Sequence, residues 1–165
     1  MKSSPQILIL MGVAGSGKST VGRALADSLG WTFSDADDFH PPANISKMSA
    51  GIPLSDQDRA PWLAALRAHC ETQLAHRTNT VLACSALKAA YRDLLVYDSA
   101  IKLIHLTAPV ELLRLRLAQR QNHFAKVELL ESQLASLEIP ADAMNLSTDH
   151  SPEFLVNKIR IHFRL

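Results

Sequence analysis

Short apolar runs alternate with amphipathic segments along this chain. Residues 7–11 (ILILM) form a continuous apolar run, which is typical of a strand that is buried on both faces. Residues 19–29 then place apolar side chains at helical spacing, and Gly30 follows where a glycine often ends a helix. Residues 31–37 (WTFSDAD) predict a second strand with acidic residues at its carboxyl end. The chain therefore begins with a predicted strand, helix and strand.

The segment from residue 38 to residue 58 has no clear period. It contains three prolines and one glycine, a composition that predicts a loop with short helical turns lying over a site. A helix follows, and two signals leave its start open. Ser55 and Asp58 fit a capping box, whereas Pro61 would then fall deep inside the helix, which favours a start nearer Ala60. The apolar stripe of this helix consists of Trp62, Leu66, Cys70 and Leu74.

The alternation of strands and helices continues to the end of the chain. Ser151 and Pro152 suit the N-cap and the first position of a last helix. This pattern predicts an α/β sandwich around a mostly parallel sheet, and 165 residues favour a single domain over residues 1–165. The remaining strands are predicted at residues 80–85, 101–106 and 143–148, and the remaining helices at 86–95, 110–121 and 127–138.

Composition and charge narrow the class of protein. An apolar content of 47% and a charged content of 20% are typical of a globular protein. The formal net charge of +1 argues against a nucleic-acid-binding module, which carries a clear basic excess. No apolar stretch approaches the ~20 residues that cross a bilayer, so we expect a cytoplasmic protein without a membrane partner. Cys70 and Cys84 form no disulfide framework, and we expect buried free thiols.

The clearest chemical signal lies between the first strand and the first helix. Residues 12–19 (GVAGSGKS) match the pattern G-x-x-x-x-G-K-[ST] without a mismatch. The glycines let successive backbone N–H groups point inward at a phosphate, and the next helix adds the positive end of its dipole. Lys18 can reach the outer phosphates, and the Ser19 hydroxyl can bind Mg²⁺. An ordinary glycine-rich turn needs no Lys-Ser pair, so the sequence predicts a nucleoside triphosphate site.

A phosphate loop does not by itself name a reaction. The base-reading pattern of GTPases, N-K-x-D, is missing, because the only Asn-Lys pair, Asn157-Lys158, is followed by Ile-Arg. The strands predicted at residues 80–85 and 101–106 do not end in the aspartate that motor ATPases carry. The remaining acidic strand end, near residue 35, is the arrangement of small kinases.

Asp35 and Asp37 stand at this acidic strand end. Two residues apart on a strand, they are expected to point to the same side. Like charges at that spacing repel each other unless a metal ion or a substrate hydroxyl gives each its own task. We expect one carboxylate to hold metal-bound water and the other to orient an acceptor hydroxyl or accept its proton. The alternative interpretation is a polar strand end with Asx turns.

Arginines and histidines supply further candidates. Arg114, Arg116 and Arg120 share a predicted helix that a break in the pattern follows. An arginine on a lid can stabilise the charge of a transferred phosphoryl group, and the alternative is a solvated helix face. His40 and His123 fall in irregular segments and are site candidates, although no histidines stand at the spacing of zinc ligands.

Residues 35–63 (DADDFHPPANISKMSAGIPLSDQDRAPWL) resemble the hallmark segment of gluconate kinases of the small P-loop type. That family reads D-x-D-x-x-H-P, N-x-x-K-M, G-x-P-L and D-x-D-R-x-P-W-L in this order, and each element is present. Residues 84–95 (CSALKAAYRDLL) resemble the family's next block, and residues 123–142 (HFAKVELLESQLASLEIPAD) resemble its lid and the helix after it. The resemblance covers nearly the whole chain to about residue 142.

The resemblance implies a fold and an activity. The fold would be a P-loop NTPase-type three-layer sandwich with a parallel sheet in the order 2-3-1-4-5 and a mobile helical lid. The activity would be ATP-dependent phosphorylation of D-gluconate at its 6-hydroxyl, which gives 6-phospho-D-gluconate. The cofactors would be ATP and Mg²⁺, and the protein would form a homodimer.

The resemblance also implies roles for individual residues. Lys18, Asp37 and Arg120 would be the catalytic groups, and Ser19 and Asp35 would serve Mg²⁺. Arg116 and Arg120 would be lid groups, and the ATP phosphates would be held by Gly12, Val13, Ala14, Gly15, Ser16, Gly17, Lys18, Ser19 and Thr20.

The sugar-acid site is implied in the same way. Arg59 suits the C1 carboxylate, because a guanidinium can grip a carboxylate with two parallel hydrogen bonds. The whole set would comprise Asp37, His40, Lys47, Arg59, Lys88 and Arg92.

Three positions depart from the family's pattern without removing a needed group. Ala36 replaces a glycine between the two aspartates, Ala90 stands where a basic or polar residue is frequent, and Asn122 stands where glycine is common. Two other functions stay open. One is a different small-molecule kinase that acts on shikimate or a nucleotide, and the other is an ATP-dependent switch without an acceptor.

Overall fold

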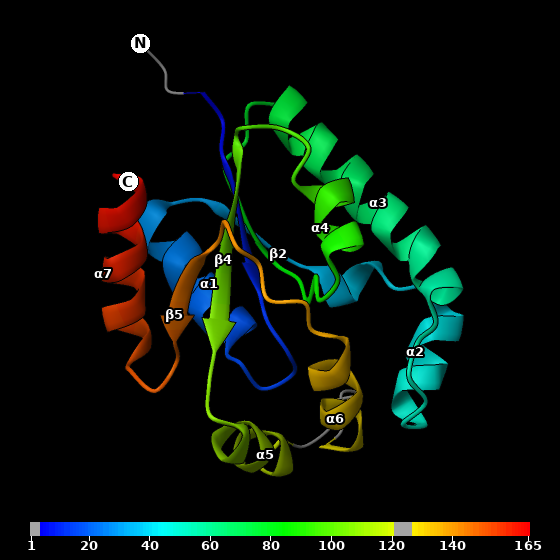
Figure 1. Cartoon of the computed structure of the whole chain (residues 1–165). Coiled ribbons are helices and arrows are strands. Elements are labelled where there is room, and N and C mark those ends of the chain that lie inside the picture. Colours follow the sequence, from blue (N-terminus) through cyan, green and yellow to red (C-terminus); the bar gives the residue numbers. More distant parts are fainter. Residues whose placement is uncertain (1–3, 121–126) are drawn as a thin grey trace.

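One five-stranded sheet organises the molecule (Figure 1). The computed structural model describes residues 4–120 and 127–165. All neighbouring strands are parallel, and the order β2-β3-β1-β4-β5 confirms the expected order. The strands are β1 (Ile7–Met11), β2 (Thr32–Asp35), β3 (Thr80–Ala83), β4 (Ile101–Thr107) and β5 (Met144–Ser147).

The central strand β1 marks the place where a ligand is expected. β1 lies between β3 and β4, so the chain goes to one side of β1 for β2 and β3 and to the other side for β4 and β5. In open α/β sheets, ligands bind beyond the carboxyl end of the strands at such a switch point. The register aligns Asp35 with Ala83 and Ala83 with Leu10, so β2 ends level with the end of β1.

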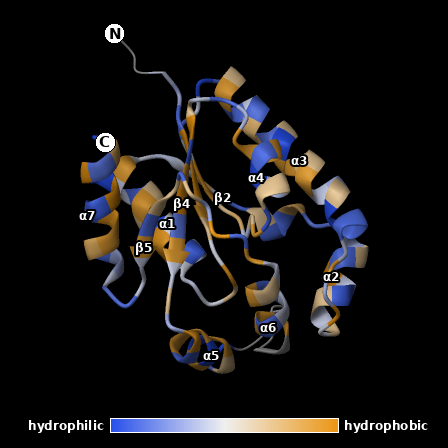
Figure 2. Cartoon of the chain, viewed as in Figure 1, coloured by the Kyte–Doolittle hydropathy of each residue, from blue (hydrophilic) through white to orange (hydrophobic). Residues whose placement is uncertain are grey.

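Helices cover both faces of the sheet and give the expected three layers (Figure 1). The side chains of β1 alternate between two cores, with Ile7, Ile9 and Met11 on one face and Leu8 and Leu10 on the other. Figure 2 shows hydrophobic strands in the middle of the sheet and helices that carry both hydrophobic and hydrophilic residues. One face carries α1 (Lys18–Leu29) and α7 (Pro152–Phe163), and the other carries α3 (Asp56–Ala75) and α4 (Ala89–Leu95).

Three further helices lie toward the carboxyl ends of the strands (Figure 1). They are α2 (Pro42–Ser49), α5 (Val110–Ala118) and α6 (Val127–Ser136). Within the described part of the chain, no helix combines the length and apolar character needed to cross a membrane.

The acidic segment after β2 departs from the expected strand. β2 ends at Asp35, and residues Ala36–Phe39 form a short 3-10 helix, η1, so Asp37 lies on η1. The side chain of Asp35 accounts for the turn, because its Oδ1 atom accepts a hydrogen bond from the backbone N–H of Asp37 at 3.1 Å. The expectation that both aspartates lie on a strand is therefore wrong, and the Asp35–Asp37 contact is the Asx turn of the alternative interpretation.

The segment from residue 38 to residue 58 is more regular than expected. Pro42 at the first position of α2 fixes a helical φ, and α2 continues for eight residues. α3 begins with the complete capping box of Ser55 and Asp58, which settles its start, and Pro61 lies inside the helix. Proline at that position removes one backbone hydrogen bond, and the next residue, Trp62, is fully buried.

Several smaller expectations can be compared with the structure. α4 begins at Ala89 instead of residue 86, and α5 ends at Ala118 instead of residue 121. The predicted lid break, with Asn122 and His123, lies outside the described residues. The expectation of buried free thiols is confirmed, and burial raises the pKa of Cys70 to about 11 and that of Cys84 to about 12.

Candidate active site

The loop between β1 and α1 is built around glycines. Gly12, Gly15 and Gly17 have φ angles of 151°, 82° and 91°, in the region that favours glycine. A Cβ atom at Gly12 would lie 2.6 Å from both the Leu106 carbonyl oxygen and the Ser16 Oγ atom, so no larger residue fits there. Gly17 is the N-cap of α1, which begins without a side-chain cap. Such a helix start suits an anion that accepts from its first amides.

The Ser16 hydroxyl gives independent evidence for a ligand in this loop. Ser16 is fully buried, and its Oγ atom has no hydrogen-bond partner among the described residues. A buried hydroxyl without a partner costs about 1–3 kcal/mol. A phosphate oxygen in the loop would remove this cost, so the loop fits the group that its sequence predicts.

Lys18 is folded back into the loop. Its Nζ atom donates to the Val13 carbonyl oxygen at 3.0 Å. Burial lowers the pKa of Lys18, while the carboxylates of Asp37 and Asp35 act in the opposite direction. The ammonium group therefore lies in the field of both aspartates and within the phosphate loop.

Ser19 and Asp35 are in direct contact. The Ser19 hydroxyl donates to Asp35 Oδ2 at 2.6 Å, while the other oxygen of Asp35 caps η1. A hydroxyl and a carboxylate are the oxygen donors that Mg²⁺ prefers. The two residues predicted to serve Mg²⁺ therefore lie together at the edge of the phosphate loop, and their chemistry fits the ion.

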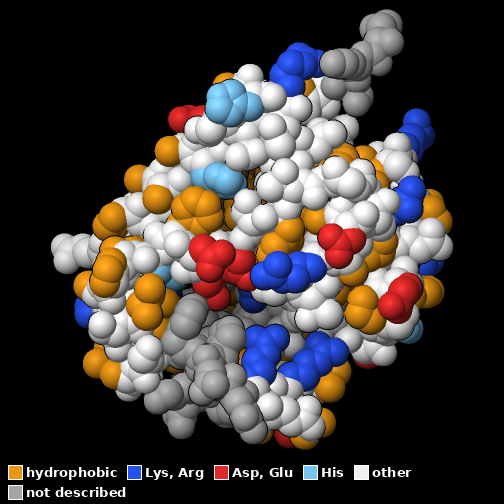
Figure 3. Space-filling model, turned by 180° about the vertical axis from the view of Figure 1, so that it is seen from behind, with side chains coloured by type: hydrophobic (Ala, Val, Ile, Leu, Met, Phe, Trp, Pro, Cys, Tyr) orange, Lys and Arg blue, Asp and Glu red, His pale blue; other side chains and the backbone are white. Residues whose placement is uncertain are grey.

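Two cavities meet at the phosphate loop. The first, which we call the carboxylate cavity, is lined by Asp35, Asp37 and Arg59, with further walls from the phosphate loop, the end of β3 and α6. The second, the Arg116 cavity, is lined by Thr20, Arg116 and residues from Thr148 to Leu155. Figure 3 shows acidic and basic side chains gathered near one another in the central and lower part of one face. The residues that line both cavities are Gly15, Gly17 and Arg120.

His40 lies on the wall of the carboxylate cavity as a neutral ring. It stacks on Trp62 with ring centroids 4.5 Å apart and an interplanar angle of 9°. Burial, followed by the positive charge of Arg59, lowers the pKa of His40 to about 4. At neutral pH the imidazole is therefore an uncharged hydrogen-bonding group.

Arg59 supplies a cation at the same cavity. Its Nη1 atom donates to the Leu54 carbonyl oxygen, and its guanidinium carbon lies 5.7 Å from the centre of the Tyr91 ring. The cavity therefore combines a phosphate loop, two carboxylates, a neutral imidazole and the guanidinium groups of Arg59 and Arg120.

Comparison with known proteins gives a consistent family. Residues 7–140 match the family model described as an AAA domain. The gluconokinase of Gluconobacter oxydans (strain 621H) is 42% identical over 168 residues, which cover 99% of this chain and 94% of that protein. The crystal structure of a gluconokinase from Sinorhizobium meliloti 1021 is 36% identical with a TM-score of 0.81, and 99% of each chain is covered. The unliganded structure of a sugar kinase from Janibacter sp. HTCC2649 is 38% identical with a TM-score of 0.89, covering 97% of this chain and 95% of that one.

The chain belongs to the gluconokinase family. In this gluconokinase family member, only some of the residues assigned to the sugar-acid site line the carboxylate cavity. Asp37, His40 and Arg59 line the carboxylate cavity. Three other basic residues, Lys47, Lys88 and Arg92, have partners elsewhere.

Lys47 and Lys88 are paired with acids in the first turn of α3. Lys47 Nζ donates to both carboxylate oxygens of Asp58 at 2.8 Å, and Lys47 and Ser55 together lower the pKa of Asp58 to about 2. Lys88 Nζ lies 2.8 Å from the carboxylate of Asp56. These pairs connect α2 and the start of α4 to α3, so a substrate role for either lysine stays a prediction.

Arg92 is buried inside the protein. Its Nη1 atom donates to the carbonyl oxygens of Ala86 at 3.0 Å and Leu87 at 2.9 Å. Ala86 has a φ of 45°, a conformation that alanine rarely adopts. The guanidinium therefore holds a strained loop after β3, and a role of Arg92 in substrate binding stays a prediction that this contact set does not favour.

The three arginines that the sequence places on one predicted helix have separate environments. Arg114 is exposed and pairs with Glu111 and Glu131, as expected of a solvated helix face. Arg116 donates to the Gly15 carbonyl oxygen at 3.2 Å and to Thr148 Oγ1 at 2.8 Å, so it joins the phosphate loop to the segment after β5. Arg120 is exposed and lines both cavities.

Two site residues were missed by the sequence reasoning. Gln133 on α6 lines the carboxylate cavity, and its Oε1 atom accepts from the backbone N–H of Ala14 in the phosphate loop at 2.7 Å. The sequence could have indicated Gln133, because this polar residue stands on the apolar side of the predicted helix, four residues after Leu129. Asn44, which is buried beside His40, is the first residue of the N-x-x-K-M element, but no role was assigned to it.

The contrast between Arg92 and Arg59 gives a direct test. Arg92→Met should lower the free energy of unfolding by about 2–3 kcal/mol, because two buried carbonyl groups lose a charged donor. Arg59→Met, the same chemical change at a half-buried position on the cavity wall, should lower it by less than about 1 kcal/mol. Urea denaturation followed by circular dichroism measures both. Equal stability of Arg92→Met and wild type would contradict the structural role.

Proposed function

We propose that this protein is a gluconokinase, which transfers the γ-phosphoryl group of ATP to the 6-hydroxyl of D-gluconate and releases ADP and 6-phospho-D-gluconate. The observation that carries this proposal is the position of the phosphate loop between two cavities. Since Gly15, Gly17 and Arg120 line both, a triphosphate bound from the Arg116 cavity would direct its terminal phosphate toward the carboxylate cavity. The relatives named gluconokinase support gluconate as the acceptor.

On the donor side, the phosphate loop would hold the triphosphate. The backbone amides between Gly12 and Thr20, the Ser16 hydroxyl and the Lys18 ammonium group are the donors for its oxygens. Ser19 and Asp35 would hold Mg²⁺, Asp35 by way of a water ligand. When bound, Mg²⁺ neutralises phosphate charge and fixes the orientation of the outer phosphates.

On the acceptor side, the carboxylate cavity offers a group for each end of the sugar acid. Asp37 lies beside Lys18 and would orient the 6-hydroxyl and accept its proton as the new O–P bond forms. Arg59 lies on a different element, α3, and would bind the C1 carboxylate with two parallel hydrogen bonds. Opposite charges on the cavity wall would thus set the direction in which gluconate binds.

The transferred group gathers negative charge on its oxygens during the reaction. Lys18 from the phosphate loop and Arg120, two residues after the end of α5, are the cations that would stabilise this charge. Because Arg120 is exposed and lines both cavities, it would complete the site from the side of the proposed lid.

We also propose that the chain is a single kinase domain that forms a homodimer in the cytoplasm. Light scattering should then give a solution mass near twice 18.1 kDa. A mass near that of one chain would contradict the dimer.

An assay of ADP formation tests the proposed reaction. With ATP and Mg²⁺, D-gluconate should give one ADP per 6-phospho-D-gluconate, while shikimate, gluconolactone and nucleoside monophosphates give little ADP. Lys18→Ala should lower turnover by roughly 10²-fold or more, because the developing charge loses a donor. Lys158→Ala, on the exposed side of α7, is the matched control with unchanged turnover. ATP binding without gluconate-dependent ADP formation would support a switch instead.

The proposed carboxylate contact has its own test. Arg59→Ala should raise the KM for gluconate by roughly 10- to 100-fold, since a charged hydrogen-bond pair contributes about 1.5–3 kcal/mol. The KM for ATP should stay within about twofold, because the loss is on the acceptor side. Arg67→Ala, on the same helix and paired with Glu71, is the control that leaves both constants unchanged. Equal increases in the two KM values would reject the contact.

A further inference from the structure

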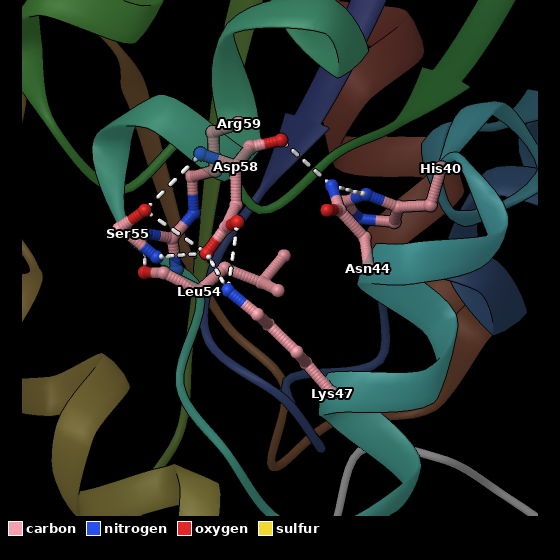
Figure 4. A network of polar contacts seen from close by, with 7 residues as sticks. All are labelled: His40, Asn44, Lys47, Leu54, Ser55, Asp58 and Arg59. Atoms are coloured by element: carbon pink, nitrogen blue, oxygen red, sulfur yellow. Dashed lines mark hydrogen bonds and ion pairs between the residues drawn. The ribbon is translucent and has the colours of Figure 1, made fainter.

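His40, Asn44 and Asp58 form a chain of hydrogen bonds beside the carboxylate cavity (Figure 4). Asn44 on α2 has only 2% of its surface exposed. Its Nδ2 atom lies 2.8 Å from the backbone carbonyl oxygen of Asp58 and 3.2 Å from Nδ1 of His40. The side chain of Asp58 points instead toward Lys47 and Ser55, so its charge is engaged on the other side. The backbone of α3 is thus connected through one buried amide to the His40 ring.

The Asp58 carbonyl decides which atom donates and which accepts in each of these hydrogen bonds. A backbone carbonyl can only accept a hydrogen bond, so the Asn44 atom that faces the Asp58 carbonyl must be the amide nitrogen. This nitrogen carries a second hydrogen, which is directed at Nδ1 of His40. Nδ1 therefore has to be the unprotonated, accepting nitrogen of the ring, and the ring hydrogen of neutral His40 is on Nε2.

The His40 ring is also fixed in position. It lies flat against Trp62, and the Trp62 indole is itself held by its Nε1 atom, which donates to the Ala36 carbonyl oxygen at 2.7 Å. A 180° flip of the ring would put the carbon Cδ2 in the place of Nδ1 and lose the Asn44 contact, so this contact selects one of the two flip states. His40 lines the carboxylate cavity, and no acceptor among the described residues takes the Nε2 hydrogen.

We propose that Asn44 is a positioning residue that holds His40 as the Nε2–H tautomer, so that the cavity offers a neutral donor to a hydroxyl oxygen of the sugar acid. This inference rests on the proposed function and deepens it. A neutral donor binds a hydroxyl without attracting an anion. A charged imidazolium would compete with Arg59 for the C1 carboxylate and weaken the preference for one substrate direction.

The electrostatic setting of His40 agrees with this role. The charged side chains on the same cavity wall are Lys18, Asp35, Asp37, Arg59 and Arg120. Burial and the charge of Arg59 lower the pKa of His40 to about 4, so the ring is neutral at pH 7. These groups keep His40 neutral, whereas Asn44 selects which of the two neutral tautomers the ring adopts.

The decisive variant is Asn44→Asp, which keeps the size of the side chain. A carboxylate has no hydrogen for Nδ1 and accepts one instead, so His40 should take the Nδ1–H tautomer and a higher pKa. We expect the KM for gluconate to rise roughly tenfold, the KM for ATP to stay within about twofold, and the KM for gluconate to become pH-dependent between about pH 5 and 8. Asn157→Asp, an exposed change of equal charge on α7, should change none of these.

A double-mutant comparison separates positioning from a merely structural role. In a His40→Gln background, Asn44→Asp should cause little further change in the KM for gluconate, because the ring on which Asn44 acts is gone. An increase as large as that in the wild-type background would overturn the proposal.

Nuclear magnetic resonance of ¹⁵N-labelled histidine tests the tautomer without any substitution in the site. Wild-type protein should show His40 with a protonated Nε2 and an unprotonated Nδ1 at pH 7, and the assignment can use His40→Gln. A protonated Nδ1 in wild type would overturn the proposal, even if Asn44→Asp failed to fold. The tautomer can be measured whether or not gluconate is the substrate, so its failure is distinct from failure of the proposed function.

Discussion

The site depends on one turn of backbone at the carboxyl end of the central strand. β1 is buried on both faces and is held by a strand on each side, so the position at which the chain leaves the sheet is fixed. Immediately after it, Gly12 passes so close to the Leu106 carbonyl that a side chain cannot fit. The rigid sheet thus holds in place a loop of amides, a lysine and the buried Ser16 hydroxyl, which has no hydrogen-bond partner in the part of the chain that the structure describes. Such preorganisation is what allows fixed dipoles to stabilise a phosphate.

The first turn of α3 fixes the acceptor side of the site, as the turn after β1 fixes the phosphate loop. Asp58 binds Lys47 of α2 through its side chain and Asn44 of α2 through its backbone, while Asp56 binds Lys88 at the start of α4. Ion pairs on the surface contribute little to stability. Their value here is geometric, because they place α2, and with it the environment of His40, against the helix that carries Arg59.

Three arginines that the sequence does not distinguish have different environments in the structure. Arg59 lies on a cavity wall, Arg92 is buried against two carbonyl groups, and Arg114 is exposed between two glutamates. The resemblance assigned both Arg59 and Arg92 to the sugar-acid site. A motif gives the type and spacing of its residues, but it does not give the hydrogen-bond partners of each side chain. A buried guanidinium needs acceptors close by, and the loop after β3 provides them for Arg92 alone among these three.

The sequence by itself determined the alternation of strands and helices, the phosphate loop and the three-layer fold, because these depend on local periodicity and on the conformational freedom of glycine. The sequence also contained the capping box of α3, but Pro61 left the start of that helix open until the structure settled it. Only the tertiary structure decided that Gln133 reaches Ala14 and that Asn44 faces His40. The physical reason is that these contacts join residues from different elements, and their hydrogen bonds are set by how the helices pack on the sheet.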